Sequence, residues 1–552
     1  MNKQIAELLF PHIEKTEADY EAMYPARNLP EGAKVTRLGP SPTGFIHLGN
    51  LYGAFVDERL AHQSNGIFYL RIEDTDDKRF VPGAVDTIIN SLGYFGINFD
   101  EGVTKDGDVG TYGDYTQSHR KEIYQCFVKK LVEEGKAYPC FLTEDEITDI
   151  RTKQEAAKLT PGIYGEFALS RNLSYYEIKE KIDAGMPYVV RLASGGDCSQ
   201  REDIVRKVRV KDAIRGVLEM PENFHDVVIL KATGIPTYHF AHVVDDHLMR
   251  TTHVVRGAEW LPSLPTHIEL FEKLGWESPI YCHTAQLMKL GEDGNKRKLS
   301  KRHDPELSLD FYRKQGFHPT AVREYLLTIL NSNFEEWRME NPDAPIDDFP
   351  FTTEKMSNSG ALFDINKLMD ISKDVLLQIS ANELYDFLKD WSAEFRPEIM
   401  NIFDDKAYML QILDLGRNDQ KPRKDLIYAE QIIEFISYFF DDMFKVEDAV
   451  PAEAEADQRA ILNAYLEGYD HKDDQSQWFD KIRAIATELG YAAKPKDFKK
   501  HPEEYKGHVG HVSTVIRIAL MGRSQSPDLW AIQQIMGEEM TKKRIANFAS
   551  RI

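Results

Sequence analysis

The residues of this chain best suited to chemistry lie in two short loops far apart in the sequence. In the first loop, His47, Gly49 and Asn50 follow the stretch GPSPTG, at the expected start of a helix. A helix N-terminus offers free backbone N–H groups and the positive end of the helix dipole, so it suits phosphate. Glycine allows a phosphate or a flat base to approach the backbone, and histidine adds a donor. Taken alone, these residues fit a helix cap without a ligand better than a phosphate site.

The second loop carries Lys298 and Lys301 on either side of Ser300. Lysine is a compact, mobile point charge, which suits phosphates that must be bound and then released. Short basic runs are also common in ordinary surface turns, so this loop has a structural interpretation as well. The two loops together make a nucleotide-binding site the hypothesis to test.

The elements around the first loop indicate how it is positioned. Residues 35–77 have the pattern strand, glycine-rich loop, helix and second strand, with the helix expected to stop at Asn65-Gly66. The second strand, in IFYLRIEDTD, is a short apolar run that breaks into acidic residues, as at the carboxyl end of a buried parallel strand. This order is typical of the opening of a doubly wound α/β fold.

The rest of the chain changes character near residue 330. Before it, helical and strand-like segments are mixed, and residues 187–193 predict a strand. Beyond it, helical patterns dominate, as in residues 425–444 and 478–491. We therefore expect an α/β body followed by an all-α C-terminal region.

Composition excludes several broad classes of protein. With 552 residues, 42% of them hydrophobic, the chain can bury a large core, and its length suggests about three to five domains. A net charge of −22 argues against a polybasic nucleic-acid tail, although a local basic face could still bind RNA phosphates.

The four cysteines show no C-x-x-C spacing, which argues against a disulfide framework. No signal peptide and no apolar run of about 18 residues is present, so a cytoplasmic protein without membrane spans is expected.

Four sequence blocks carry a family resemblance. R-L-G-P-S-P-T-G-F-I-H-L-G-N at 37–50 resembles the HIGH region of class I aminoacyl-tRNA synthetases in its glutamyl form. R-I-E-D-T-D at 71–76, V-V-R-G-A-E-W-L at 254–261 and K-L-S-K-R at 298–302 are similar to the next blocks of that family, in the same order. The resemblance extends over nearly the whole chain and indicates the glutamate–tRNA ligase family.

The resemblance implies a two-step reaction. A glutamate carboxylate attacks the α-phosphate of ATP, and the resulting glutamyl adenylate is passed to the 3′ end of tRNA(Glu) in protein biosynthesis. It implies ATP with Mg²⁺, L-glutamate and tRNA(Glu) as ligands, a monomer, and neither DNA nor a membrane as partner. Because only Cys140 stands where some relatives carry a Cys-rich module, no zinc is expected.

The resemblance also implies a domain order and a Rossmann-like catalytic domain. Residues 1–110 and 231–330 would form its two halves, the second with the KLSKR loop. Residues 111–230 would be an inserted acceptor-stem-binding α/β domain, 331–400 a helical stem-contact domain, and 401–552 a helical anticodon-binding domain.

The site residues implied by the resemblance fall into four groups. Arg37 and Arg256 would bind a substrate carboxylate, which a guanidinium can hold bidentately, and Glu73 would bind the α-amino group. At residue 242 the family often has asparagine and at residue 39 more commonly alanine, so His242 and Gly39 are departures. The full sets are His47, Lys298 and Lys301 for catalysis; His47, Gly49, Asn50, Glu259, Trp260, Ser300 and Lys301 for ATP; Arg37, Ser41, Glu73, Tyr238, His242 and Arg256 for glutamate; and Arg417, Lys421, Arg423, Lys424, Lys494, Lys496, Lys499 and Lys500 for tRNA.

Other interpretations remain open at this stage. A glutaminyl enzyme is disfavoured by R-I-E-D-T-D and the helical tail, and the shorter paralogue that modifies a queuosine base is disfavoured by length. A non-catalytic RNA-binding relative is disfavoured by the intact His47 and lysines. A metallohydrolase could use the cluster at 239–247, but on a strand His239 and His242 would point to opposite faces, so no metal site is predicted there.

Overall fold

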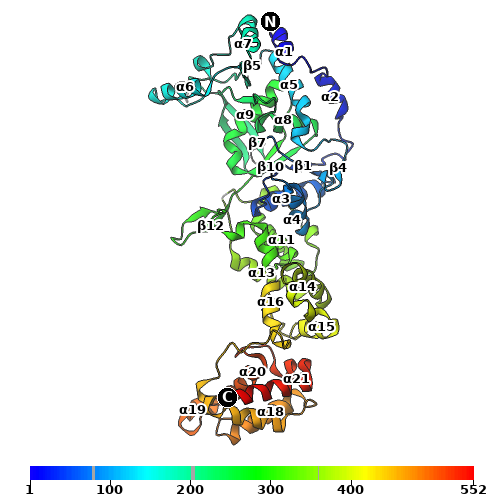
Figure 1. The fold of residues 1–552 in the computed structure, drawn as a ribbon, viewed down its shortest axis with the longest axis vertical. Helices are drawn as coiled ribbons and strands as arrows, with labels where there is room; N and C mark the ends of the chain where they lie inside the picture. The colour runs from blue at the N-terminus through cyan, green and yellow to red at the C-terminus, as the bar shows by residue number, and fades with distance from the viewer. Residues whose placement is uncertain (77–80, 200–204, 359) are drawn as a thin grey trace. The chain divides into compact units, whose positions relative to one another are not determined.

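The computed structural model describes residues 1–76, 81–199, 205–358 and 360–552, in two compact units (Figure 1). The first unit comprises Met1–Phe311 and Arg323–Asp364, and the second comprises Tyr312–Val322 and Ile365–Ile552. None of the helices in the described part of the chain combines the length and apolarity needed to cross a bilayer.

The centre of the first unit is a twisted parallel sheet in two hydrogen-bonded parts. Strands β1 (Val35–Leu38), β2 (Ile67–Leu70) and β3 (Glu101–Thr104) are parallel, and β4 (Gly107–Val109) closes their edge as a hairpin. In the second part, β10 (His253–Gly257), β11 (Ile280–Thr284) and β7 (Lys207–Asp212) are parallel, and β8 (Gly216–Pro221) pairs antiparallel with β7. The parts adjoin at β1 and β10, where the Thr252 N–H donates to the Val35 carbonyl at 2.9 Å.

This arrangement confirms the doubly wound fold. The chain leaves β1 toward β2 on one side, and its second half enters at β10 on the other side, so the strand order reverses between β1 and β10. Helix α3 (Leu48–His62) packs over β1, β2 and β10. It ends at His62, slightly before the predicted stop, and Asn65 then takes a left-handed φ of 54°. Ligands of such folds bind at the carboxyl ends of the strands where the order reverses.

The remaining elements of the first unit surround this sheet. A separate antiparallel sheet has the order β5 (Ala137–Cys140), β6 (Val189–Leu192) and β9 (Val228–Leu230), which confirms the strand predicted at 187–193. A third sheet joins the hairpin of β12 (Leu287–Leu290) and β13 (Lys296–Lys298) to β14 (Ala361–Leu362). The helices are α1 (Asn2–Leu9), α2 (Glu17–Met23), α4 (Ala84–Tyr94), α5 (Lys121–Glu133), α6 (Glu144–Ala156), α7 (Tyr175–Asp183), α8 (Tyr238–Leu248), α9 (Leu264–Leu274) and α12 (Phe334–Glu340).

The segment at 238–247 corrects one sequence-based argument. It was expected to be a strand, but it forms helix α8, so His242 and Asp246 share one face and bond at 2.7 Å. Eight of the eleven residues of α8 are buried, so the helix has no distinct solvent-facing side that a polar and apolar pattern could indicate. The sequence of a helix that is buried on nearly all sides lacks a helical hydrophobic period. The β-branched residues in it then make a strand the expected structure.

The second unit is built from helices, as predicted. They are α13 (Ile365–Gln378), α14 (Ala381–Phe395), α15 (Lys406–Asp414), α16 (Ala429–Ile436), α17 (Gln458–Gly468), α18 (Gln475–Glu488), α19 (Pro495–Lys500), α20 (Val509–Met521) and α21 (Leu529–Arg551), while α10 (Leu309–Gln315) and α11 (Pro319–Leu330) span the division between the units. The helical pattern at 425–444 forms α16 and then a short 3-10 helix at Ser437–Phe439, and beyond it Asp441 pairs with Arg544 at 2.7 Å.

Candidate active site

A cavity of about 540 Å³ opens where the strand order reverses. It lies within the first unit, at the carboxyl ends of β1 and β10. The structure brings most of the predicted ATP and glutamate residues together here. Those that line the cavity are Arg37, Ser41, His47, Gly49, Asn50, Glu73, Tyr238, Arg256, Glu259, Trp260 and Lys298. Ser300, Lys301 and His242 are not part of its lining.

His47 is the N-cap of helix α3. Its Nδ1 accepts from the Asn50 N–H at 3.2 Å, and the Asn50 side chain accepts from the His47 N–H at 3.1 Å. A Cβ on Gly49 would lie 2.9 Å from Nδ1, so glycine makes room for the ring. Burial lowers the pKa of His47, which favours the neutral ring. Because Nδ1 accepts, the proton of a neutral ring is on Nε2, which is left as a donor.

The KLSKR loop is held by a buried carboxylate that the sequence did not single out. Asp304 accepts from Arg297 at 2.6 and 2.7 Å and from the Ser300 N–H at 2.8 Å. These bonds lower the pKa of Asp304, so the carboxylate stays ionised. Beyond the anchored turn, Lys301 is exposed and lies 4.0 Å from the ring centroid of Phe45, in the first phosphate loop. The loop base is therefore fixed, while Lys298 and Lys301 are exposed.

Arg256 lies on β10 with an unusual set of partners. Its Nε donates to His283 Nε2 at 3.0 Å and its Nη1 donates to His267 Nδ1 at 3.0 Å. Its Nη2 is buried and has no partner among the described residues. A buried guanidinium nitrogen with no partner is costly, and a ligand carboxylate could satisfy it. The two histidines were missed by sequence reasoning, although His283 is the direct register partner of Arg256 in the parallel pair β10–β11.

Arg37 is held differently, by a buried ion-pair network. Its Nε donates to Asp246 at 3.2 Å, and Arg71 donates to the same carboxylate at 2.7 Å. Burial opposes ionisation of Asp246, but the charges of Arg37 and Arg71 outweigh it and hold its pKa well below the ordinary value. Arg71 also donates to Glu73 at 2.8 Å. Asp246 could not be recognised from the sequence as the centre of this network, because that requires knowing that residues 238–248 form a helix.

The other predicted glutamate residues have distinct surroundings. Burial raises the pKa of Glu73 against the opposing effect of Arg71 and Arg37. A Cβ on Gly39 would lie 2.3 Å from Glu73 Oε1, so the glycine at this position leaves room for the carboxylate. The Tyr238 ring lies 4.6 Å from Trp260 and 5.8 Å from His242 between ring centroids. His242 lies behind this wall, bonded to Asp246, and burial lowers its pKa to about 4.

Comparison with known proteins identifies the family of this chain. The family model described as "tRNA synthetases class I (E and Q), catalytic domain" matches residues 34–370, which is more than half of the chain. The chain belongs to the class I tRNA synthetase family (E and Q). A second model, described as "Anticodon binding domain", matches residues 383–549 of the synthetase.

Individual relatives match over nearly the full length of this synthetase. It is 61% identical to the glutamate–tRNA ligase of Acetivibrio thermocellus over 98% of this chain and 99% of that protein. It is 48% identical to a glutamate–tRNA ligase of Clostridium perfringens over 98% of this chain and all of that protein. A crystal structure of a glutamate tRNA ligase from Elizabethkingia meningosepticum in complex with its amino acid has a TM-score of 0.73 and 27% identity, covering 94% of this chain and 99% of that one.

The cations predicted to contact tRNA fall into two kinds in the second unit of the synthetase. Arg417 is buried and donates to the Leu376 and Ile379 carbonyls at the end of α13, so its guanidinium serves the fold. Arg423 pairs with Asp425 and Lys424 with Asp374, while Lys421 is exposed. In contrast, Lys494, Lys496, Lys499 and Lys500 are exposed and have no ion-pair partner among the described residues.

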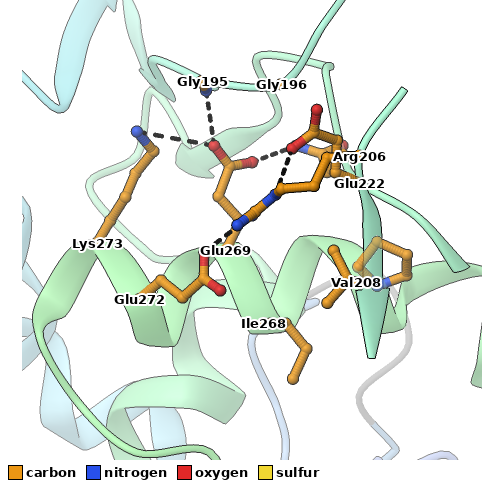
Figure 2. A pocket seen from close by; sticks show the side chains of 11 residues that line it. Gly195, Gly196, Arg206, Val208, Glu222, Ile268, Glu269, Glu272 and Lys273 are labelled. Carbon is orange, nitrogen blue, oxygen red and sulfur yellow. Dashed lines mark hydrogen bonds and ion pairs between the residues drawn. The ribbon is translucent and has the colours of Figure 1, made fainter. Parts of the chain in front are cut away.

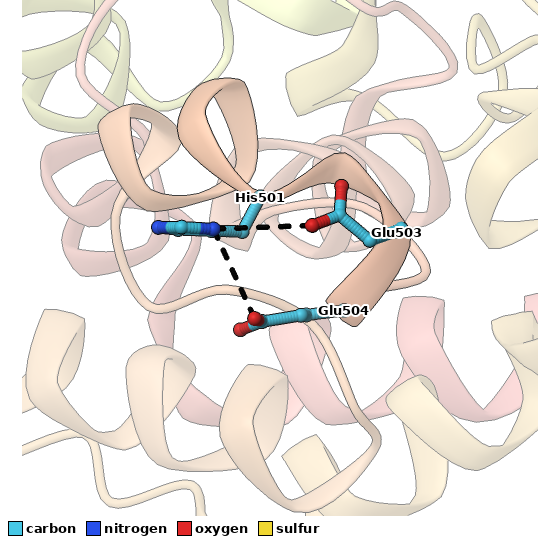
Figure 3. Close-up of side chains that lie close together, drawn as sticks. All are labelled: His501, Glu503 and Glu504. Atoms are coloured by element: carbon cyan, nitrogen blue, oxygen red, sulfur yellow. Dashed lines mark ion pairs between the residues drawn. The ribbon is translucent and has the colours of Figure 1, made fainter.

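Metal-ligand clusters are scarce in the described part of the synthetase. The one group of three or more potential ligands there is His501, Glu503 and Glu504, all exposed, which Figure 3 shows around a single turn. The acids and histidines of α8 already have partners: His239 bonds His267, His247 bonds Glu21 and Asp245 bonds Arg120, while His242 and Asp246 bond each other. The cysteines are all free, and Cys126, Cys140 and Cys282 are buried.

A second cavity of about 340 Å³ lies beside α9 (Figure 2). Its carboxylates are neutralised from within: Glu222 pairs with Arg206 at 2.9 Å, and Glu272 pairs with the same arginine at 3.4 Å. Glu269 accepts from the Gly195 N–H at 2.8 Å and lies 3.7 Å from Lys273. These internal bonds leave the cavity without a charged group aimed at a ligand.

Proposed function

We propose that this chain is a glutamate–tRNA ligase, which activates L-glutamate with ATP and transfers it to the 3′ end of tRNA(Glu). The observation that carries the proposal is the cavity at the switch point, which is lined both by His47 and Lys298 of the two loops proposed for phosphate and by Arg256, whose buried Nη2 has no partner among the described residues. The similarity of this chain to glutamate–tRNA ligases over nearly its whole length supports the same function.

At the phosphate end, the proposed ATP residues are His47, Gly49, Asn50, Glu259, Trp260, Ser300 and Lys301. The Nε2–H of His47 and the mobile charges of Lys298 and Lys301 would stabilise the negative charge that develops on the α-phosphate and the leaving pyrophosphate. The substrate carboxylate is the nucleophile, so positioning and charge stabilisation are the tasks left to the protein. Mg²⁺ would enter with the ATP phosphates as part of that substrate.

At the other end, Arg256 and Arg37 are the proposed partners of the glutamate carboxylate, with Glu73 for its ammonium group. Ser41 and Tyr238 line the same cavity. We leave His242 out of direct contact, because its Nδ1 is engaged by Asp246 behind the cavity wall. Its proposed role is to orient Asp246, which in turn orients Arg37.

For tRNA, the proposal rests on the lysines at 494–500 within residues matched to the anticodon-binding domain. The first of them, Lys494, lines a cavity of about 410 Å³ together with Phe479, Arg483, His508 and Arg517. Cations beside aromatic rings are suited to phosphates and unpaired bases. We further propose the five domains with the boundaries given above, a cytoplasmic monomer, and no protein-bound zinc, which the isolated cysteines support.

Aminoacylation of purified glutamate and glutamine tRNAs, compared side by side with labelled glutamate and labelled glutamine, tests the function. Transfer of glutamate to tRNA(Glu), dependent on ATP, is the expected result. Transfer of glutamine in preference to glutamate would assign the chain to the other branch of its family. Absence of transfer, together with no ATP–pyrophosphate exchange when tRNA is present, would contradict the ligase.

A further inference from the structure

The side chains that directly contact the Arg256 guanidinium carry no charge. Its Nε and Nη1 each donate to a histidine nitrogen at 3.0 Å, and its guanidinium carbon lies 4.7 Å from the ring centroid of Tyr281. In the described part of the chain it has no carboxylate ion-pair partner. This differs from Arg37, whose charge is met by Asp246 at 3.2 Å.

The histidine bonds fix the protonation of both rings. A guanidinium can only donate, so His283 Nε2 and His267 Nδ1 must be acceptors and both rings must be neutral. The proton of His283 is then on Nδ1, which donates to Asp212 at 2.7 Å. The proton of His267 is on Nε2, which donates to His239 Nδ1 at 2.8 Å. Burial lowers the pKa of His267, of His283 and of His239, in agreement with neutral rings.

We propose that His267 and His283, the latter oriented by Asp212, are positioning residues that hold Arg256 rigidly without neutralising it, and thereby set the preference of this site for a carboxylate over a carboxamide. The proposal rests on the proposed function, because it takes the ligand to be the glutamate carboxylate. It assigns specificity to residues that need not touch the substrate.

The physical argument concerns what a buried arginine gains from its ligand. A carboxylate brings two acceptor oxygens and the counter-charge, whereas a carboxamide brings one acceptor oxygen, an NH2 group that can only donate, and no charge. An arginine already paired with an internal carboxylate gains less from a ligand anion than an unpaired arginine does. Neutral histidines supply the acceptors that fix the guanidinium and leave the whole charge, and the buried Nη2, for the substrate.

Two matched substitutions at His267 separate positioning from charge. Asparagine and aspartate both place an oxygen near the position of Nδ1, but only aspartate adds a counter-charge. The expected KM for glutamate is about 10- to 100-fold higher in His267→Asp than in His267→Asn, as for loss of a hydrogen bond to a charged group. The KM for ATP should be the same in both. The aspartate variant should also lose discrimination against glutamine, measured as the inhibition constant of glutamine.

Equal glutamate KM values in the two variants would overturn the proposal, whether both are raised or neither. Should either variant unfold at a lower urea concentration than the wild type, His283→Gln and His283→Glu provide a second pair, because their side-chain oxygen reaches the position of Nε2. The same ratio of glutamate KM values is expected between these two variants, and equal values would again overturn the proposal.

Calorimetric titration with L-glutamate distinguishes this inference from the proposed function. A wild type that charges tRNA(Glu) while the paired variants bind glutamate equally would overturn the inference alone. A wild type that binds glutamate but transfers none would overturn the ligase, while the ratio between variants would still decide the inference. A wild type that does neither would overturn both.

Discussion

Replacing His47 by asparagine or by glutamine should separate two roles that this histidine combines. Its Nδ1 caps helix α3, and its Nε2–H is the donor proposed to face phosphate. Asparagine carries an oxygen near the position of Nδ1, so His47→Asn keeps the cap and loses the donor. Glutamine carries an N–H near the position of Nε2, so His47→Gln keeps the donor and loses the cap.

The magnitudes follow from the two bonds. Loss of an N-cap acceptor costs about 1 kcal/mol of stability, since the second half of the capping box, from Asn50 to the His47 N–H, remains. Loss of one donor to developing charge costs about 2.7–4 kcal/mol in the transition state, a factor of roughly 10²–10³ in rate. His47→Asn should therefore unfold like the wild type and react slowly. His47→Gln should be less stable and react within about tenfold of the wild type.

ATP–pyrophosphate exchange with tRNA present measures the rate, and urea unfolding measures the stability. His47→Ala serves as the reference that loses both the cap and the donor. The reasoning is refuted if His47→Asn exchanges at the wild-type rate, because the histidine would then be a helix cap only. It is also refuted if both variants lose rate and stability together.

Three further outcomes are expected. Lys301→Ala should slow adenylate formation by about 10²–10³ with little change in the glutamate KM, and single-turnover rates would contradict this if only KM rose. Glutamine substitutions in the 494–500 lysine group should flatten the salt dependence of tRNA binding by roughly 0.7–0.9 per phosphate contact, whereas the internally paired Lys542 and Lys543 serve as a control that leaves it unchanged. The pKa of His242 near 4, against 6.5 unfolded, means that the unfolded chain binds the extra proton first, so His242 alone should lower stability by about 2 kcal/mol between pH 7 and pH 5. The buried His253 and His318, with pKa values also near 4, add to the fall in every variant, so urea unfolding at both pH values should show a fall about 2 kcal/mol smaller in His242→Asn than in the wild type; an equal fall in both proteins would refute the assignment.

The loops of the site could be predicted from the sequence because their chemistry is local. A glycine two residues after His47 and a helix beginning at the same point follow from the residues themselves, and the structure places the ring over that glycine. The strand before the loop and the strand after the helix were likewise predicted, and both lie in one parallel sheet. Short-range backbone geometry and hydrophobic periodicity are sufficient for such features.

The partners of the arginines could not be predicted, because they depend on long-range register. His283 faces Arg256 only through the pairing of β10 with β11, and Asp212 reaches His283 from a third strand. Arg417 was predicted to contact tRNA, but its guanidinium bonds the last carbonyls of α13, some 40 residues earlier. A charged side chain in a turn gives no local sign of whether it is buried by a distant element.

The pairing of cations explains how an acidic chain can bind anionic ligands. With a net charge of −22, the chain as a whole repels ATP, glutamate and tRNA. Where a cation serves the fold, a carboxylate or several carbonyls of the chain meet it, as Asp441 meets Arg544 and the end of α13 meets Arg417. Arg256 and the lysine group at 494–500 lack such a partner in the described part of the chain, and they lie at the two places assigned to anionic ligands. Because a paired cation gains less from a further anion than an unpaired one gains from its first counter-ion, the absence of pairing is a better guide to binding than the number of cations.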